Sequence, residues 1–368
     1  MTYFTCAWVC INMLCRLGCS LPVELWHRGP GEMSDQMRGL VEPLGVTCVD
    51  ALKVRKRHPA RILNGWELKP YAIMHSRFEE VLYLDADNVP VVDPTFLFET
   101  PQYREAGAIF WPDFGRLEPD REAWALTGVE YRDEPEVESG QLLIGKARCW
   151  APLSLAMWMN EHSDFWHQYI HGDKETFHLA WRKLGLPNAM PDRGIDALEG
   201  VMCQHDFDGR RIFQHRNMRK FVAGVPNPQT PGFLFERECI DYLAQLEEQW
   251  TELSDYRNLH RRATPAEQAI ARELCSRRWL YRRVGHDQRT MSFEVDGSVG
   301  EGADECERTW SLTARPSLTY LLIRGGNGPT CLLTPVSPDH WSGRWTVHER
   351  MPIELIADGR WATKSARS

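Results

Sequence analysis

The sequence has little of what an exported or membrane-spanning protein needs. Its N-terminal apolar run extends from Tyr3 to Cys15, which is shorter than the roughly 20 residues of a transmembrane helix. No basic segment precedes this run, and no small-residue cleavage site follows it. We therefore predict neither an export signal nor a membrane anchor, and a cytoplasmic protein.

An excess of positive charge is also missing. Lys and Arg together number 43 against 51 Asp and Glu, which gives a formal net charge of −8. Proteins that bind the phosphates of nucleic acids are usually basic, either overall or along one stripe. The charge balance therefore argues against nucleic acid as a partner.

No C-x-x-C pair occurs among the 11 cysteines, which are spread from Cys6 to Cys331. An odd number of scattered cysteines is typical of reduced thiols rather than of a disulfide framework. Cys6, Cys10, Cys15 and Cys19 have helical spacings, but these match no common zinc module. We expect them to pack as small apolar residues.

Helix-like and strand-like segments alternate in the first part of the chain. Residues 4–17 have the spacing of an amphipathic helix, and the apolar stretches that begin at Leu21 and Gly45 are typical of strands. Residues 67–80 predict the next helix and Val81–Leu84 the next strand. This alternation predicts an α/β domain over residues 1–225, with a mostly parallel sheet flanked by helices.

The sequence changes character after this domain. Residues 226–285 are charged and helical in pattern, with a capping box at Thr264, Pro265 and Glu267, and we expect a helical connector there. Residues 286–368 consist of short β patterns between Gly and Pro turns, which predict a small β-rich domain. Its tryptophans could stack on sugars, but packing in a small core is their expected role. They are Trp310, Trp341, Trp345 and Trp361.

Two carboxylates, Asp85 and Asp87, follow the predicted strand Val81–Leu84. Acids this close repel each other unless a cation, a proton or N–H donors compensate them. A D-x-D pair at a strand end can bind one hard divalent cation, which in turn can neutralise the phosphates of a nucleotide. The alternative is that both residues only cap the next turn.

Three further segments carry polar residues at expected element ends. In "ESGQ", Gly140 would let the backbone approach a ligand, or it would mark a β-bulge. In "HGDKE", Asp173 would cap its helix, bind sugar hydroxyls, or both. After the short strand 212–214, His215 is followed by Arg216, Arg219 and Lys220, which would clamp a diphosphate or form a solvated basic loop.

Taken in order, "LKPYAIMHSRFEEVLYLDADNVPVVDPTFLF", "GAIFWPDF", "ESGQLLI" and "HGDKETFHLAWRKLG" resemble the Mnn1/Mnn2-type α-mannosyltransferase family, relatives of glycogenin-like retaining glycosyltransferases. The resemblance extends over roughly residues 10–225. It implies a GT-A fold and transfer of a hexose, most simply mannose, from GDP-mannose or a UDP-hexose to a glycan or other hydroxyl acceptor. It also implies a Mn²⁺ (or Mg²⁺) ion bound by Asp85 and Asp87, with the family's late histidine at His215.

The resemblance assigns further roles. Asp173 and Gln141 would be the catalytic residues, and Trp111 and Asp113 would form an acceptor or sugar wall. The donor would be bound by Asp85, Asp87, Asn88, Lys69, Gly140, Lys174 and Lys220. The family has a strand before the helix of residues 4–17, so we expect the domain as given to lack its first strand. Family relatives are Golgi type II membrane proteins, which leaves an upstream anchor open.

Two other functions compete with glycosyl transfer. One is an inactive, sugar-binding homologue of the same family. The other is a haloacid-dehalogenase-type phosphatase, in which a D-x-D pair supplies a nucleophile and a general acid. That phosphatase fold needs a later Gly-Asp and then, after three or four intervening residues, a second acid, whereas Phe177 and His178 occupy those positions after Gly172-Asp173. Transfer of a hexose is the function we predict.

Overall fold

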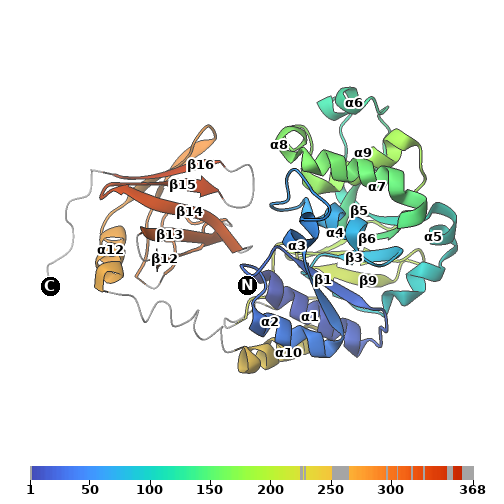
Figure 1. Ribbon diagram of the computed structural model, residues 1–368, viewed down its shortest axis with the longest axis horizontal. Helices are drawn as coiled ribbons and strands as arrows, with labels where there is room; N and C mark the ends of the chain where they lie inside the picture. Colours follow the sequence, from blue (N-terminus) through green and yellow to red (C-terminus); the bar gives the residue numbers. More distant parts are fainter. Residues whose placement is uncertain are drawn as a thin grey trace. The chain divides into compact units, whose positions relative to one another are not determined.

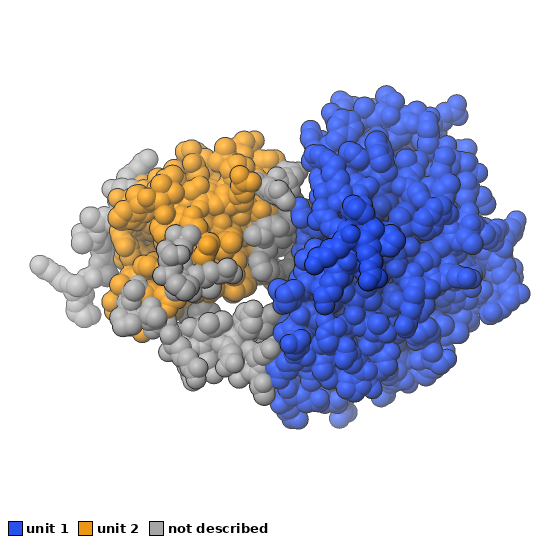
Figure 2. Space-filling view, in the orientation of Figure 1, with its two compact units in different colours: residues 1–250 blue, residues 251–368 orange. Residues whose placement is uncertain are grey.

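The computed structural model describes residues 2–223, 227, 229–250, 265–295, 297–304, 306–315, 318–325, 328–345 and 351–358. They belong to two compact units, residues 1–250 and 251–368 (Figure 1, Figure 2). The segment expected to be a connector, 226–285, is divided between them. Its described residues contribute α10 (Glu236–Gln249) to the first unit, and α12 (Pro265–Cys275) and β10 (Trp279–Arg283) to the second.

The first unit is a mixed α/β domain, as expected. Its helices are α1 (Thr2–Arg16), α2 (Asp35–Val41), η1 (Glu42–Leu44), α3 (Ala51–Arg55), α4 (Leu68–His75), η2 (Pro94–Glu99), α5 (Pro101–Ala106), α6 (Glu122–Thr127), α7 (Lys146–Glu161), α8 (Ser163–Trp166), α9 (Gly172–Leu184) and α10 (Glu236–Gln249). Its strands are β1 (Val23–His27), β2 (Val46–Asp50), β3 (Glu80–Leu84), β4 (Asn88–Pro90), β5 (Ala108–Arg116), β6 (Pro135–Gly145), β7 (Asp196–Leu198), β8 (Val201–His205) and β9 (Arg211–His215).

The strand directions differ from the mostly parallel sheet that the sequence predicted. Among the described strands of this unit, only β1 and β2 pair in parallel. The sheets β3-β6-β5 and β4-β9-β8-β7 are antiparallel. A pattern of alternating helices and apolar runs does not record strand direction, which depends on how each connection returns to the sheet.

Apolar side chains fill both faces of the β3-β6-β5 sheet. On one face, β5 and β6 pack against α7 and α9 (Figure 1), with Phe110, Leu142, Phe177 and Trp181 in the core. On the other face, Ile109 and Leu143 belong to a core that also contains residues of β9. The sheet is therefore held rigidly where β3 and β6 lead into the polar residues.

The helix expected at 4–17 is α1, which is followed by Gly18 with a φ of +82°. It packs against α10, where the Trp8 Nε1–H donates to the Tyr242 carbonyl at 2.8 Å. Cys6 and Cys10 are buried in α1, and all 11 cysteines, each among the described residues, are free thiols. The predicted packing is thus confirmed for Cys6 and Cys10, whereas Cys15 is exposed and Cys19 is half-buried.

The second unit is β-rich, with one seven-stranded antiparallel sheet in the order β11-β10-β16-β15-β14-β13-β12. These elements are α12 (Pro265–Cys275), β10 (Trp279–Arg283), β11 (Asp287–Met291), β12 (Thr309–Arg315), β13 (Leu318–Gly325), β14 (Gly328–Ser337), β15 (His340–Trp345) and β16 (Pro352–Ala357). Trp310, Trp341 and Trp345 lie in its core, as expected. Trp361 and Thr264 lie outside the described residues.

No helix within the described ranges is both long enough and apolar enough to cross a bilayer.

Candidate metal and donor site

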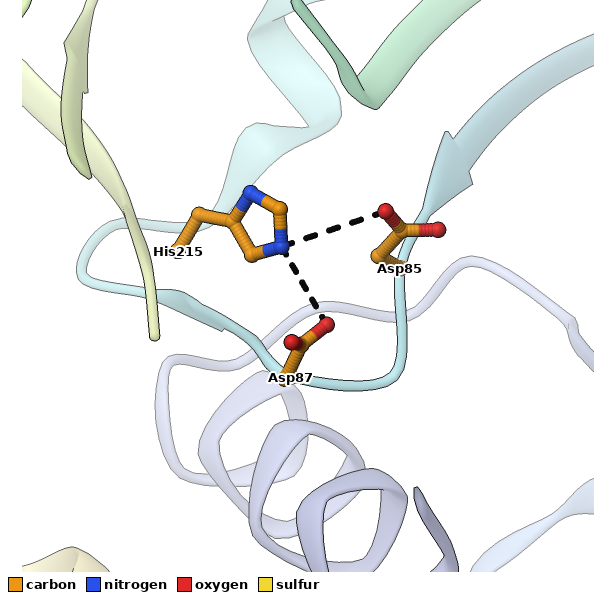
Figure 3. A group of neighbouring side chains, drawn as sticks. All are labelled: Asp85, Asp87 and His215. Carbon is orange, nitrogen blue, oxygen red and sulfur yellow. Dashed lines mark ion pairs between the residues drawn. The ribbon is translucent and has the colours of Figure 1, made fainter. Parts of the chain in front are cut away.

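Asp85, Asp87 and His215 meet where three strands end (Figure 3). Asp85 follows β3, Asp87 precedes β4, and His215 is the last residue of β9. The antiparallel pairing of β4 with β9 places Asn88 opposite His215, which brings the imidazole next to the D-x-D turn. The His215 Nε2 atom lies 3.2 Å from Asp87 Oδ1 and 3.9 Å from Asp85 Oδ2. One potential ligand atom from each residue lies within 4.8 Å of the others.

The turn between the two aspartates is fixed by main-chain and amide hydrogen bonds. The Asp85 N–H donates to the Gly140 carbonyl at 2.8 Å, and the Asn88 N–H donates to the Asp85 carbonyl at 2.9 Å. The Asn88 side-chain amide donates to Gly140 O at 3.0 Å and to Gln141 Oε1 at 2.8 Å. Asn88 Oδ1 and Gln141 Nε2 are buried and accept or donate no hydrogen bond among the described residues. Buried polar atoms normally have partners, so this turn has unused capacity for a ligand.

Positively charged side chains compensate the repulsion between Asp85 and Asp87. Lys220 Nζ forms an ion pair with Asp87 Oδ2, opposite the contact with His215. Burial by itself would raise the pKa of Asp87, but His215 and Lys220 outweigh it and lower that pKa well below its ordinary range. Burial also dominates at Asp85, whose pKa is raised although Lys69 and His215 oppose the shift. The two carboxylates of the motif are therefore in different electrostatic environments.

Lys69 connects the D-x-D turn to the start of α9. Its buried Nζ lies 3.2 Å from Asp85 Oδ2 and 3.2 Å from Asp173 Oδ2. It also donates to the carbonyl and the hydroxyl of Ser139 at 2.8 and 2.9 Å, and the Ser139 hydroxyl donates to Asp173 Oδ2 at 2.8 Å. Burial opposes its charge, yet the two aspartates raise the pKa of Lys69 above its ordinary value. Lys69 thus holds two acids in place.

Gly140 makes room for a contact that the sequence did not reveal. A Cβ at this position would lie 2.5 Å from His215 Nδ1 and 2.7 Å from Glu138 Oε1. Glu138 Oε1 accepts a hydrogen bond from the Gly140 N–H at 2.7 Å and lies 3.3 Å from His215 Nδ1. The absence of a side chain at Gly140 therefore lets His215 and Glu138 come close to each other over the backbone of β6.

Glu138 is the main site residue that sequence reasoning missed. A carboxylate on the second nitrogen of a metal-binding histidine fixes the tautomer and the orientation of the ring. Although burial disfavours charge on the imidazole, Asp87 and Glu138 raise the pKa of His215 to about 10. The signal was available in "ESGQ", since Glu138 and Gly140 are two residues apart on one strand and share a face.

Lys174, the residue after Asp173 in α9, forms an ion pair with Asp113. Lys174 Nζ lies 2.5 Å from Asp113 Oδ2 and 2.7 Å from Glu136 Oε2. Glu136 also forms a second group of potential metal ligands with His171 and Glu175. Cations already neutralise that group, because Lys174 pairs with Glu136 and Arg121 contacts Glu175 at 2.8 Å.

The side chains of three residues singled out from the sequence have their partners away from the triad, although the Arg216 main-chain N–H donates to the Asp87 carbonyl at 3.0 Å. Trp111, expected in a sugar wall, has a fully buried side chain whose Nε1–H donates to the His205 carbonyl at 2.9 Å. Arg216 stacks on Phe221, 4.0 Å from its ring centre, and Arg219 pairs with Glu199. A fully buried Trp111 cannot contact a sugar. Because the side chains of Arg216 and Arg219 have other partners, Lys220 is the residue of the expected basic cluster that remains beside the triad.

The geometry brings three potential metal ligands together at strand ends. Comparison with known proteins gives the family. The sequence matches the Mannosyl_trans3 family model, described as "Mannosyltransferase putative", over residues 2–128 and 120–197. The match covers more than half of the chain. The protein belongs to this family, which confirms the resemblance inferred from the sequence motifs.

Curated relatives include fungal alpha-1,2-mannosyltransferases. MNN24 of Candida albicans is 31% identical over 165 residues, which cover 34% of this chain and 23% of that protein. MNN2 of Saccharomyces cerevisiae is 26% identical over 256 residues, covering 57% and 43%. MNN5 of the same yeast is 23% identical over 274 residues, covering 58% and 47%. The chain therefore spans less than half the length of each of these relatives.

Among solved structures, the crystal structure of apo mouse xyloside xylosyltransferase 1 is similar at a TM-score of 0.36 and 16% sequence identity. The similarity covers 52% of this chain and 80% of that one. At this level it does not bear on the fold.

Proposed function

We propose that the protein is a metal-dependent, retaining glycosyltransferase with a GT-A-type domain. It would transfer a hexose, most simply mannose, from a nucleotide sugar such as GDP-mannose or a UDP-hexose to a hydroxyl of a glycan. Family membership supports the class of reaction. The single observation that supports the metal and the donor is the meeting of Asp85, Asp87 and His215 in one buried site next to Lys220.

The residues present suit a divalent cation. Two carboxylates and one imidazole form a mixed oxygen and nitrogen donor set, which Mn²⁺ accepts more readily than the harder Mg²⁺. Asp85, Asp87 and His215 would hold the ion, and the free Asn88 Oδ1 adds an unused acceptor beside them. When bound, the ion would neutralise negative charge on the diphosphate of the donor and of the leaving group.

The surrounding side chains would then bind and orient the donor. Lys220 lies against Asp87 and would contribute a positive charge to the diphosphate. Asp173 is oriented by Lys69 and Ser139, so its carboxylate is presented as a hydrogen-bond acceptor for sugar hydroxyls. Gln141 lies one residue beyond Gly140, on the face of β6 that carries Ser139. Its unpaired Nε2 is available there as a hydrogen-bond donor.

A retaining reaction in which the diphosphate leaves from the face that the acceptor approaches needs no strong general base. Stabilisation of the leaving group would supply most of the catalysis, an effect usually worth several kcal/mol. Asp173 and Gln141 would position the sugar rather than abstract a proton. NMR of the product should therefore show a retained anomeric configuration. An inverted product would require a general-base mechanism instead.

The decisive experiment incubates the purified protein with GDP-mannose and UDP-hexoses, with Mn²⁺ or with a chelator, and measures released nucleoside diphosphate. We expect release only with metal, and its loss in Asp87→Asn. Asp196→Asn is a matched control, because Asp196 pairs with His205 at 3.0 Å in a different place. Circular dichroism and thermal melting would show that both variants fold.

The outcomes separate the competing functions. Binding of metal and nucleotide without turnover would indicate an inactive, sugar-binding homologue. Equal nucleoside diphosphate affinity with and without metal would contradict the proposed site.

A further inference from the structure

Trp66 is an exposed tryptophan that is held beside the candidate site. Its side chain is 44% exposed, although it precedes a helix whose next residues are largely buried. One side of the ring packs on the backbone of Gly172, where a Cβ would lie 2.7 Å from the ring. Gly172 has a φ of +67°, a conformation that other residues rarely adopt. Glycine at this position thus lets the indole lie directly on the start of α9.

The loop that carries Trp66 is fixed by hydrogen bonds. Glu67 Oε2 accepts from the N–H groups of Gly65 at 2.7 Å and Asn64 at 3.2 Å. Glu67 Oε1 accepts from the Ser163 hydroxyl at 2.6 Å, and the glutamate is buried. A buried carboxylate with three donors restrains the loop, so the indole is presented in one place before any ligand binds.

Two independent links place this ring next to the proposed reaction centre. Along the chain, Trp66 lies one helical turn before Lys69, and Gly172 directly precedes Asp173. In space, Lys69 Nζ and Asp173 Oδ2 are 3.2 Å apart, and Lys69 is also 3.2 Å from Asp85. The contacts therefore lead from the metal triad through Lys69 and Asp173 to Trp66.

We propose that Trp66 is the platform of an acceptor subsite, on which one pyranose ring of the acceptor glycan stacks. This inference rests on the proposed function and adds the acceptor to it. A pyranose has an apolar C–H face that suits the face of an indole, and polar edges that need hydrogen bonds. His171, adjacent to Gly172, has a largely exposed side chain whose Nδ1 lies 3.3 Å from Glu175 Oε1, which leaves its Nε2 for those edges.

The order of the contacts selects the acceptor rather than the donor. The diphosphate belongs at the triad and Lys220, and the transferred sugar belongs at Asp173. The next position outward from the triad is the indole, where the sugar that receives the hexose would lie. A donor nucleotide would instead contact Lys220 and the Asp85, Asp87 and His215 triad, where the diphosphate belongs.

The test measures acceptor binding without requiring turnover. The probes are methyl α-mannopyranoside and α-linked mannotriose, titrated by saturation-transfer NMR and calorimetry into the full chain with Mn²⁺ and nucleoside diphosphate present. We expect Trp66→Ala to weaken mannotriose binding roughly tenfold. Trp66→Phe, which keeps an aromatic face, should recover most of this loss.

Trp150→Ala is the matched control. Trp150 is 50% exposed and lies near the start of α7, just after the end of β6 that is remote from Gln141. This variant should bind mannotriose like the unsubstituted protein. Nucleoside diphosphate affinity in the presence of Mn²⁺ should be the same in all the variants.

Each other result contradicts the inference. If Trp66→Ala also loses nucleotide affinity, the indole belongs to the donor. If it binds mannotriose normally, or if the unsubstituted protein shows no binding of either probe, Trp66 is not an acceptor platform. Because metal-dependent nucleotide binding is measured separately, failure of this inference leaves the proposed donor site standing, whereas failure of the donor site would be seen in that second measurement.

Discussion

Substitution of Gly140 by alanine should disable the candidate metal site through one added methyl group. The new Cβ would lie 2.5 Å from His215 Nδ1 and 2.7 Å from Glu138 Oε1. The Gly140 backbone cannot retreat easily, because its carbonyl accepts hydrogen bonds from the Asp85 N–H and the Asn88 amide. The imidazole must therefore shift from the position in which its Nε2 faces Asp87 and its Nδ1 faces Glu138.

The size of this displacement sets the expected loss. Ordinary contacts between non-bonded atoms lie near 3.5 Å, so the ring must move by about 1 Å. Overpacking of a filled site costs about 1–3 kcal/mol of the free energy of unfolding. A histidine displaced from its position should weaken metal binding by at least tenfold, the lower end of the effect of losing a supporting partner.

The assay compares Gly140→Ala with Gly145→Ala, which lies on the same strand. A Cβ at Gly145 would also be too close to its surroundings, 2.9 Å from the Tyr103 hydroxyl, but at the other end of β6. Both variants should lose stability in urea unfolding. Only Gly140→Ala should lose Mn²⁺ affinity in calorimetry and metal-dependent binding of nucleoside diphosphate. Normal Mn²⁺ affinity in a folded Gly140→Ala protein would refute the reasoning that His215 is a ligand held by this packing.

Three further substitutions test other parts of the structure. Glu138→Gln should weaken Mn²⁺ binding about 10- to 100-fold by removing the carboxylate from His215; Glu134→Gln, at a second glutamate–histidine pair, should leave calorimetric Mn²⁺ affinity unchanged. Asp173→Asn should lower kcat through lost sugar contacts, and a basic limb that vanishes from its pH–rate profile would contradict the positioning role. Burial, with His58 and Lys146 nearby, lowers the pKa of His75 to about 4. The unfolded chain then binds the proton more tightly, so stability should be full above about pH 6.5 and fall towards pH 4. The measurement is urea unfolding at pH 7 and pH 4.5, for the unsubstituted protein and for His75→Asn. Because His75 is only half-buried, the free energy of unfolding that is lost between the two pH values should be about 1 kcal/mol larger in the unsubstituted protein.

The sequence predicted those parts of the site that depend on local pattern. An apolar strand followed by Asp85 and Asp87 could be recognised because strand, turn and carboxylates are contiguous. His215 was assigned only through family resemblance, because a histidine at the end of one strand gives no information about which other strand it will face. The pairing of Asn88 with His215 supplies that information, and it is a property of the folded sheet.

The contacts of Trp111, Asp113 and Arg216 could not be predicted either, because they also depend on the folded sheet. Trp111 and Asp113 are two residues apart on β5, yet Trp111 is fully buried and donates to the His205 carbonyl, whereas Asp113 pairs with Lys174. Arg216 appeared to belong to a basic cluster, but the rings of Phe221 and Phe233 hold its guanidinium. Local sequence records charge and polarity, whereas register and packing decide which groups meet.

The pairing of β4 with β9 also affects the order in which the protein can mature. Two acids of the site come from one turn, while the histidine and Lys220 come from a segment synthesised much later. Until that late segment arrives, the two mutually repelling carboxylates lack the cations His215 and Lys220, and Lys69 and the Tyr83 hydroxyl contact only Asp85 of the pair. Non-local pairings of this kind form slowly during folding. Acquisition of Mn²⁺ affinity by the candidate site should therefore follow the pairing of β4 with β9, and a chain that ends before β9 would leave the edge of β4 unpaired.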